Sequence, residues 1–481
     1  MCLLLDPQAR SGYMCRVIMW SSGVARRVLI AAASVLAAAV FVFWYTGGKV
    51  RLPMRIPGTD LGPDGQNAVR ANPVLTGKVI LGTGAPGKTE GDWPQFRGPA
   101  RDGISLESTP LARSWPGTGP KILWATDVGE GYAGPAVAGG RVYLMDYDRE
   151  KKQDALRCLS FDTGEEIWRF TYPVAIKRNH GMSRTVPSVS SNMVVAIGPK
   201  CHIAAVNAET GALLWGMDMV REFGTTVPPW YAGQCPLIEG DRLILAPGGK
   251  DALLVAAKAA SGEIVWKSPN PRGWKMTHSS IMPIEVEGER MYIYCADKGV
   301  AGVSARDGAI LWDTTDWKIS IATVPSPLAL DGGRVFLSGG YNAGSMMIRI
   351  RKTGDTFGVE SLFRLAPSVF GATQQSPVFY QGHIYGVRPD GKFTCLTPEG
   401  KTLWTSEGKP FGLGPFVLGS GLVYGVNDNG LLRLLEATPA KFTPLAQAQV
   451  LTGREAWGPL ALTSGRLLAR DLTRMVCIEV K

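Results

Sequence analysis

The sequence predicts an all-β protein, an eight-bladed β-propeller, because one short motif returns at a nearly constant interval. A glycine followed four residues later by tryptophan occurs at Gly164/Trp168, Gly211/Trp215, Gly262/Trp266, Gly308/Trp312 and Gly400/Trp404. These tryptophans lie 47, 51, 46 and 92 residues apart, and the last interval holds two units of 46. A repeat of 40–50 residues is typical of a propeller or a solenoid. After residue 100 no segment shows sustained helical periodicity.

Each repeat is expected to contain four short strands. In the first unit the strands are 136–138, 141–145, 156–161 and 166–172, separated by Gly, Asp and Asn turns. The following units span 186–219, 235–268, 282–317, 324–365, 375–407, 414–451 and 457–481. The fifth unit carries Phe363 at the tryptophan position and the seventh carries Leu445.

The last unit lacks a fourth strand, because the chain ends after the strand at 474–480. Residues 121–128 read as an outer strand, with Trp124 in the tryptophan position and no unit before it. We therefore expect the two ends of the domain to share the last blade. Closing the ring in this way leaves no long free strand edge.

The repeat also indicates a family. The Thr-Gly-x-x-x-Trp turn resembles the tryptophan-docking repeat of pyrroloquinoline-quinone-type propellers. The stretches 92–103 (DWPQFRGPARDG) and 446–451 (AQAQVL) resemble those of PQQ-binding-like β-propeller repeat proteins. The fold is also similar to that of the propeller lipoprotein of the outer-membrane β-barrel assembly machinery. The resemblance covers about residues 92–481 and implies the propeller fold, while many members of that family have no assigned activity.

The N-terminal region predicts one transmembrane helix. Residues 28–45 carry no charge and would form roughly 27 Å of helix, close to the thickness of a hydrocarbon core. Arg26 and Arg27 precede this stretch, and Trp44 and Tyr45 close it. We expect a cytoplasmic tail at 1–25, a signal anchor at 26–46, a Gly/Pro-rich linker at 47–90 and the propeller at 91–481. This order places the propeller in the periplasm, tethered to a bacterial inner membrane. A cleaved signal peptide is the alternative.

Charge and cysteine usage exclude several function classes. The net charge is +10, but residues 1–90 hold ten Lys/Arg against four Asp/Glu, which leaves only +4 for the propeller. This balance does not favour a nucleic-acid partner. Of the eight cysteines, Cys158, Cys395 and Cys477 occupy equivalent positions in separate units, too far apart for the ~7 Å limit of a disulfide. We expect buried thiols.

Two nucleotide-binding patterns occur outside their usual structural setting. Residues 82–89 match a P-loop, and residues 129–134 match GxGxxG. A phosphate site needs a helix directly after the glycine-rich loop. Neither segment has such a helix, because Gly91, Pro94 and Pro135 would interrupt it. Both matches are interpreted as coincidences.

The candidate site follows from propeller geometry. Every loop that leaves an outer strand must return to the next inner strand, so all eight loops converge on one face. The ligand-binding candidates on this rim are His180, Arg184, Trp230, Tyr231, Gln234, Trp274, His278, Gln374, Gln375 and Trp457. They would form a polar and aromatic pocket. The alternative is that each residue only caps strand ends or fills the channel.

The rim chemistry favours binding over catalysis. Pyrroloquinoline quinone with calcium would need an aromatic floor, for which Trp230 or Trp274 could serve, and a carboxylate partner such as Arg184. It would also need a cluster of Asp, Asn and Glu oxygens for Ca²⁺ and a carboxylate base, and no such cluster is found in the rim loops. We therefore predict no catalytic residue, metal site or cofactor.

Three functions remain from this interpretation. The favoured one is a membrane-tethered, non-catalytic scaffold that binds a protein or envelope component on the periplasmic side. The alternatives are a pyrroloquinoline-quinone-dependent oxidoreductase, which would be a quinoprotein dehydrogenase, and a carbohydrate-binding propeller. The sequence indicates neither the partner nor the oligomeric state.

Overall fold

The computed structural model describes residues 22–46 and 71–481, and its contacts divide the chain into two units, Met1–Arg55 and Ile56–Lys481. The first unit contains one helix, α1 (Ser22–Thr46). Among the helical residues that are described, no stretch is both long and apolar enough to cross a membrane. The membrane anchor therefore stays a prediction. Most of the expected tail, residues 1–21, and residues 47–70 of the expected linker lie outside the described residues.

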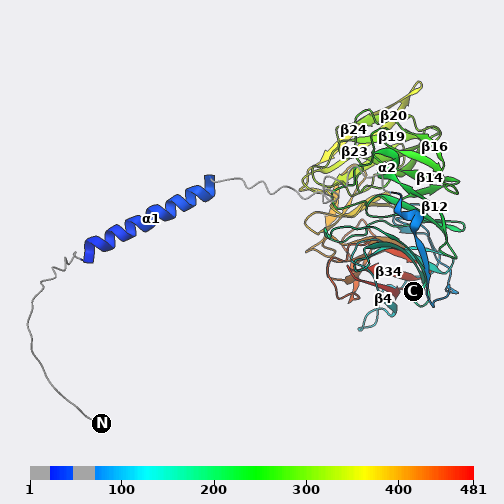
Figure 1. The fold of residues 1–481 in the computed structure, drawn as a ribbon, viewed down its shortest axis with the longest axis horizontal. Coiled ribbons are helices and arrows are strands. Elements are labelled where there is room, and N and C mark those ends of the chain that lie inside the picture. The colour runs from blue at the N-terminus through cyan, green and yellow to red at the C-terminus, as the bar shows by residue number, and fades with distance from the viewer. Residues whose placement is uncertain (1–21, 47–70) are drawn as a thin grey trace, which may run out of the picture. The chain divides into compact units, whose positions relative to one another are not determined.

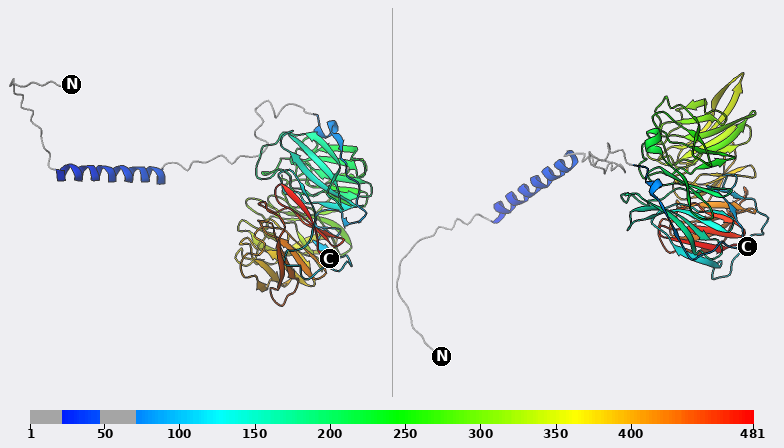
Figure 2. Two further views of the ribbon diagram at one scale, coloured as in Figure 1. Left: turned by 90° about the horizontal axis from the view of Figure 1, so that it is seen from below. Right: turned by 45° about the vertical axis from the view of Figure 1, so that its right-hand side comes forward.

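The second unit is an eight-bladed β-propeller, as predicted (Figures 1 and 2). Each blade is an antiparallel sheet of four core strands, which run outward from the centre in chain order in the first seven blades, while β4 is the outermost strand of blade eight. Neighbouring inner strands contact each other, for example β9 with both β5 and β13. The eight sheets coincide with the eight predicted repeats.

The strand bounds follow the repeat along the chain. Blades one and two contain β5 (Ala136–Ala138), β6 (Arg141–Asp148), β7 (Gln153–Ser160), β8 (Glu166–Pro173), β9 (Ser188–Ser190), β10 (Met193–Ile197), β11 (His202–Asn207) and β12 (Leu213–Asp218). The short helix α2 (Met219–Phe223) follows blade two. Blades three and four contain β13 (Leu237–Glu239), β14 (Arg242–Leu245), β15 (Val255–Lys258), β16 (Ile264–Lys267), β17 (Met282–Val286), β18 (Glu289–Cys295), β19 (Val300–Ser304) and β20 (Ile310–Thr314).

The second half of the ring repeats this plan. Blades five and six contain β21 (Leu328–Leu330), β22 (Arg334–Gly339), β23 (Gly344–Thr353), β24 (Thr356–Leu365), β25 (Val378–Tyr380), β26 (His383–Val387), β27 (Phe393–Leu396) and β28 (Thr402–Thr405). Blades seven and eight contain β29 (Phe416–Gly419), β30 (Leu422–Val426), β31 (Leu431–Glu436), β32 (Pro444–Gln449), β33 (Ala461–Thr463), β34 (Arg466–Arg470), β35 (Arg474–Glu479) and β4 (Ile122–Asp127). The β23–β24 hairpin is the longest and projects beyond its blade (Figure 1).

Blade eight is completed by a strand from the beginning of the domain. The strand β4 pairs antiparallel with β35, and Trp124 lies opposite Cys477. Figure 1 shows β4 in the same blade as the C-terminal strand β34. The predicted closure of the ring is confirmed.

The repeated glycine and tryptophan form the contacts between blades. The Trp168 ring of blade one lies over Gly211 of blade two, and a Cβ atom on this glycine would lie 2.7 Å from the ring. Gly211 has a φ of +71°, which glycine adopts without strain. The Trp168 indole N–H donates to the Ala208 carbonyl at 3.3 Å. Each such tryptophan therefore joins its own blade to the turn of the next.

The same docking over a glycine recurs at four more junctions, one tryptophan departs from it, and blade seven has Leu445 in place of an aromatic ring. Trp124, Trp215 and Trp266 lie over Gly164, Gly262 and Gly308, and Phe363 takes the tryptophan's place over Gly400. Trp404 donates to the Thr438 carbonyl at 3.0 Å. The exception is Trp312, which donates to the Met291 Sδ of its own blade at 3.4 Å.

The C-terminal part of the expected linker differs from a free tether. The 3-10 turn η2 (Pro73–Thr76) places Val74, which is fully buried, against Gly216 of blade two. The strand β1 (Lys78–Leu81) then pairs with β8 and adds an outer strand to blade one. The P-loop-like glycines continue this contact, because Gly82 donates its N–H to the Ile167 carbonyl at 2.9 Å. In the described structure no helix comes directly after residues 82–89, so the amides of this segment are not arranged for a phosphate.

The six cysteines in the described part of the chain are free and buried. Desolvation raises the pKa of the Cys395 thiol to about 11 and that of Cys477 to about 12. These thiols are therefore protonated and pack as small apolar side chains.

Residues 92–105 close the centre of the ring and are called the channel plug. The strand β2 (Asp92–Trp93) pairs with β5 of blade one, and β3 (Ile104–Ser105) pairs parallel with β29 of blade seven. Between them the Pro94 carbonyl accepts from Val189 of blade two, at 2.8 Å. The segment thus crosses the ring from one inner strand to another, which gives 93–103 the role that its sequence left open.

Candidate functional site

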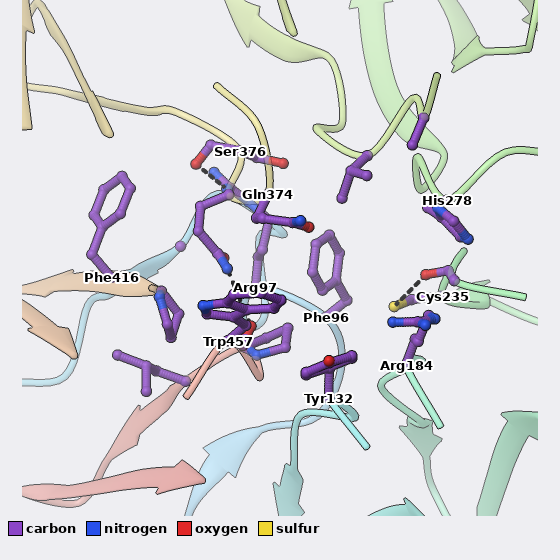
Figure 3. Close-up of a pocket in the computed structure, with 18 of the residues that line it drawn as sticks. Phe96, Arg97, Tyr132, Arg184, Cys235, His278, Gln374, Ser376, Phe416 and Trp457 are labelled. Atoms are coloured by element: carbon purple, nitrogen blue, oxygen red, sulfur yellow. Dashed lines mark hydrogen bonds between the residues drawn. The ribbon is translucent and has the colours of Figure 1, made fainter. Parts of the chain in front are cut away.

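The rim loops and the channel plug enclose one cavity of about 350 Å³, called the axial cavity. Its walls come from the loops between outer and inner strands, and its floor from Trp93, Phe96 and Arg97 of the plug. Figure 3 shows Phe96 at the centre, with Trp457 on one side and Arg184 and His278 on the other. The plug therefore forms part of the cavity lining.

Seven of the ten predicted rim residues line this cavity. They are His180, Arg184, Trp230, His278, Gln374, Gln375 and Trp457. The other three, Tyr231, Gln234 and Trp274, are absent from its lining. Sequence position alone therefore located the face and most of the lining.

The three remaining residues serve the fold. Gln234 is fully buried, and its amide exchanges hydrogen bonds of 2.6 and 2.9 Å with the backbone of Ala246. The Tyr231 hydroxyl bonds the backbone of Lys177. Trp274 packs against Gly299 within blade four and contributes to the core of blades three and four. All three fix the loops around the cavity.

Tyr132 and Trp457 form an aromatic wall. Their rings stack with centroids 5.4 Å apart and an interplanar angle of 26°. The Tyr132 hydroxyl donates to Glu455, and the Trp457 indole N–H donates to the Asp428 carboxylate at 2.7 Å. Burial raises the pKa of Tyr132, so its hydroxyl remains protonated. Because both polar ends are bonded, the wall presents flat apolar rings to the cavity.

Arg184 supplies the cationic group of the wall. Its Nε donates to the Trp230 carbonyl at 2.5 Å, and its Nη2 donates to the Asn179 and Gly181 carbonyls at 3.2 and 3.0 Å. The guanidinium carbon lies 5.0 Å from the centre of the Tyr132 ring. Burial lowers the pKa of Arg184 to about 10, so it stays charged at neutral pH. Among the described residues, no partner is found for its Nη1, which leaves one donor for a ligand.

His278 lies beside Arg184 as a neutral side chain. Burial, with a smaller effect of the Arg184 charge, lowers the pKa of His278 to about 4. Its Nε2 lies 2.9 Å from the Tyr231 carbonyl, which can only accept, so Nε2 carries the proton. The Nδ1 atom is then a hydrogen-bond acceptor.

Phe96, Arg97, Cys235 and Tyr341 also line the cavity but were not among the predicted site residues. Arg97 is held by carbonyl groups, at 2.9 Å from Nη1 to Ser376 and at 2.7 and 2.9 Å from Nη2 to Asp102 and Pro377. The available signal was a tryptophan, a phenylalanine and two arginines within 92–101, outside any repeat.

Comparison with known proteins identifies the family. The sequence profile of the outer membrane protein assembly factor BamB matches residues 116–218 and 199–457, which is more than half of the chain. The chain belongs to this BamB-like family of PQQ-like propellers. Among curated proteins, none matches the sequence.

Several solved structures are also similar to this chain. BamB from Moraxella catarrhalis is 12% identical, with a TM-score of 0.52, and the match covers 75% of this chain and 99% of that one. A europium-containing methanol dehydrogenase is 12% identical, with a TM-score of 0.45, over 81% of this chain and 90% of that one. The quinohemoprotein alcohol dehydrogenase from Comamonas testosteroni is 12% identical, with a TM-score of 0.43, over 81% and 80%. At these identities the likeness concerns the fold alone.

The side chains that line the axial cavity do not fit pyrroloquinoline quinone with calcium. The cofactor's metal needs several carboxylate and amide oxygens, and its chemistry needs a carboxylate base. No aspartate or glutamate lines the axial cavity. In the described residues, no three His, Cys, Asp or Glu side chains are grouped so as to hold a metal ion. The nearby Glu455 and Asp428 are already bonded to Tyr132 and Trp457.

Proposed function

We propose that this protein is a membrane-tethered, non-catalytic scaffold whose propeller holds a segment of a partner protein of the cell envelope at the axial cavity. The observation that carries the proposal is the cavity itself. It has a volume of about 350 Å³ and combines aromatic walls with one arginine that has an unused donor.

The chemistry of the lining indicates the kind of segment. A cavity of this size lies at the lower end of small-ligand pockets, so it holds one or two side chains rather than a folded element. The Tyr132 and Trp457 rings suit an aromatic or large aliphatic side chain. The Arg184 Nη1 suits a carboxylate, from an acidic side chain or a chain terminus. A short segment that contains both groups fits best.

Family membership supports a protein partner, because the matching profile is that of an outer membrane protein assembly factor. The tether is supported by the sequence of α1, in which Arg26 and Arg27 are followed by an uncharged stretch over residues 28–45. In this proposal the propeller lies in the periplasm and is anchored in the inner membrane.

Site-specific photocross-linking tests the proposal. A photoreactive amino acid replaces His180, which is exposed and borders the cavity, in the full chain in intact cells. We expect an adduct with one envelope protein in alkaline-washed membranes. The matched control carries the same group at Asp355, between the β23 and β24 strands and away from the cavity. This control is expected to give no such adduct.

A second variant connects the adduct to the chemistry of the cavity. Arg184→Gln is expected to reduce the His180-site adduct by about tenfold or more, because a charged hydrogen bond is lost. Equal adducts from the two cross-linker positions, or an unchanged yield in the Arg184 variant with an intact circular dichroism spectrum, would contradict cavity binding. Recovery in the alkaline-soluble fraction would contradict the tether.

A further inference from the structure

The channel plug contains two arginines that differ in burial and in bonding: Arg97 is partly buried and Arg101 is almost fully buried. Arg97 directs all three of its side-chain nitrogens to backbone carbonyls, including Nε to the Arg101 carbonyl at 3.0 Å. The positive charge of Arg97 is therefore stabilised by four backbone carbonyl oxygens. Arg101 is 1% exposed, and only its Nη1 is bonded, to Gln95 and to the Pro236 carbonyl, each at 3.1 Å. Its Nε and Nη2 atoms are buried and have no partner in the described structure.

The two unpaired nitrogens of Arg101 form one geometric unit, called the free edge. Nε–H and Nη2–H lie on the same side of the planar guanidinium and point in nearly the same direction. This is the edge that binds carboxylates and similar anions with two parallel hydrogen bonds. The opposite side of the guanidinium is the one that is fixed by Gln95 and Pro236. The orientation of the free edge is therefore set by the fold.

The charge of Arg101 is also uncompensated. Burial lowers the pKa of Arg101 to about 10, which still leaves the guanidinium protonated at neutral pH. No carboxylate of the described residues lies within ion-pair distance of it. Cys235 nearby is a buried thiol whose pKa is raised by burial, and Glu239 is already paired with Arg290 and bonded to the Tyr292 hydroxyl. A buried charge without a partner is strongly destabilising, so a counterion bound at Arg101 would stabilise the fold.

The free edge lies next to the floor of the axial cavity. The Arg101 guanidinium carbon is 5.8 Å from the centre of the Phe96 ring, and Phe96 lines the cavity. Figure 3 shows Phe96 near the centre of the cavity and Cys235 beside Arg184. An anion at Arg101 would thus be shielded from solvent while remaining one side chain away from the cavity.

We propose that the free edge of Arg101 binds a small monovalent anion of chloride size, which neutralises the channel plug from within. The site is independent of the proposed partner segment, which uses Arg184 on the cavity wall. Because the anion binds only the folded protein, it stabilises the plug between blades one, three and seven.

Thermal unfolding of the full-length chain in detergent tests the site. Sodium chloride replaces sodium gluconate at constant ionic strength, so that only the small anion changes. We expect Tm to rise and saturate, by about 3 °C when chloride reaches a 100-fold excess over its Kd. The variant Arg101→Gln keeps a polar side chain but loses the two parallel donors of the free edge. In this variant we expect chloride no longer to raise Tm.

Arg433→Gln is the matched control, because Arg433 also has an unpaired Nε but lies on β31, away from the plug. It is expected to keep the chloride response. The proposal is overturned if chloride does not raise the Tm of the wild-type protein, or if Arg101→Gln responds as the wild-type protein does.

Crystals of the wild-type protein soaked in bromide give a reading that does not depend on any variant folding. An anomalous peak within about 3.5 Å of the Arg101 Nε and Nη2 atoms is the expected result. Density that is explained by water alone at this position, with bromide ordered elsewhere, would overturn the proposal.

Discussion

Replacing Trp124 with alanine is expected to lower the free energy of unfolding by about 3–5 kcal/mol. Trp124 is 7% exposed and lies on β4, the strand that completes blade eight. Its ring covers Gly164 of blade one, and its indole N–H donates to the Phe161 carbonyl at 2.9 Å. The alanine variant therefore loses both apolar contact and a hydrogen bond at the junction that closes the ring. Chemical denaturation of the full chain measures the change.

Trp124→Phe is the matched variant for this prediction. It keeps an aromatic ring over Gly164 but loses the indole donor, so the expected loss is smaller, about 1–2 kcal/mol. A Trp124→Ala variant that unfolds within 1 kcal/mol of the wild-type protein would mean that the closing junction does not depend on this docking.

Asp154 gives the largest expected pH effect. It lies on β7, is fully buried, and neither of its carboxylate oxygens has a partner in the described structure. Burial raises the pKa of Asp154 to about 8, although Tyr172 and the charge of Lys200 act in the opposite direction. The bare Gly198 leaves room here, because a Cβ atom would lie 2.5 Å from both Asp154 Oδ2 and the Tyr172 hydroxyl. The carboxyl group is therefore held protonated up to neutral pH.

The sign of the effect follows from proton binding. Between the unfolded pKa, near 4, and about 8, the folded state binds more protons than the unfolded state at this residue, so its contribution to stability falls as pH rises. Asp154→Asn stays neutral throughout. We expect the stability of the variant relative to wild type to increase by about 4 kcal/mol between pH 5 and pH 8. Denaturation curves at several pH values measure this difference.

Asp162→Asn is the control with the opposite sign. Burial alone would raise its pKa, but the hydrogen bonds from Thr89, Arg466 and the backbone of Lys88 together outweigh this effect and keep the pKa of Asp162 below its usual value. The wild-type residue therefore stabilises the fold above pH 4 and loses this effect on acidification.

A flat difference between Asp154→Asn and wild type from pH 5 to pH 8 would show that Asp154 does not titrate as a buried acid.

The ring could be predicted from the sequence because each blade contact is made within a short segment. The turn glycine needs a positive φ, and the tryptophan four residues later needs the bare glycine of the next blade, so both residues recur at a fixed spacing. Phe363 keeps this role with a different ring, which is why the fifth unit could be placed despite its missing tryptophan.

Trp312 shows what the spacing could not predict. Its Cα partner across the sheet is Gly302, and the indole turns over this glycine toward Met291 instead of the next blade. Likewise, residues 71–90 were assigned to a linker on their Gly and Pro content. Their packing depends on Val74 and on the open edge of β8, which are contacts between distant segments.

The candidate site was predicted only in part for a similar reason. The loop rule placed seven residues around the cavity, but it does not determine which way each side chain points. Trp230 and Tyr231 both have positive φ, and only Trp230 lines the cavity. The floor could not be found in this way, because the plug belongs to no repeat and its position depends on pairing with blades one and seven.

A disulfide between the two ends of the domain tests the closed ring most directly. Asp127 and Arg474 are partners in the β4–β35 ladder and form an ion pair of 3.2 Å. In the double variant Asp127→Cys, Arg474→Cys, we expect oxidation to link the strands, seen as faster migration on non-reducing gels that reductant reverses. The pair Asp127→Cys, Lys481→Cys is the control, since residue 481 lies beyond the end of β35. Free thiols in the first pair, or equal linkage in both, would contradict a propeller whose last blade is shared by its two ends.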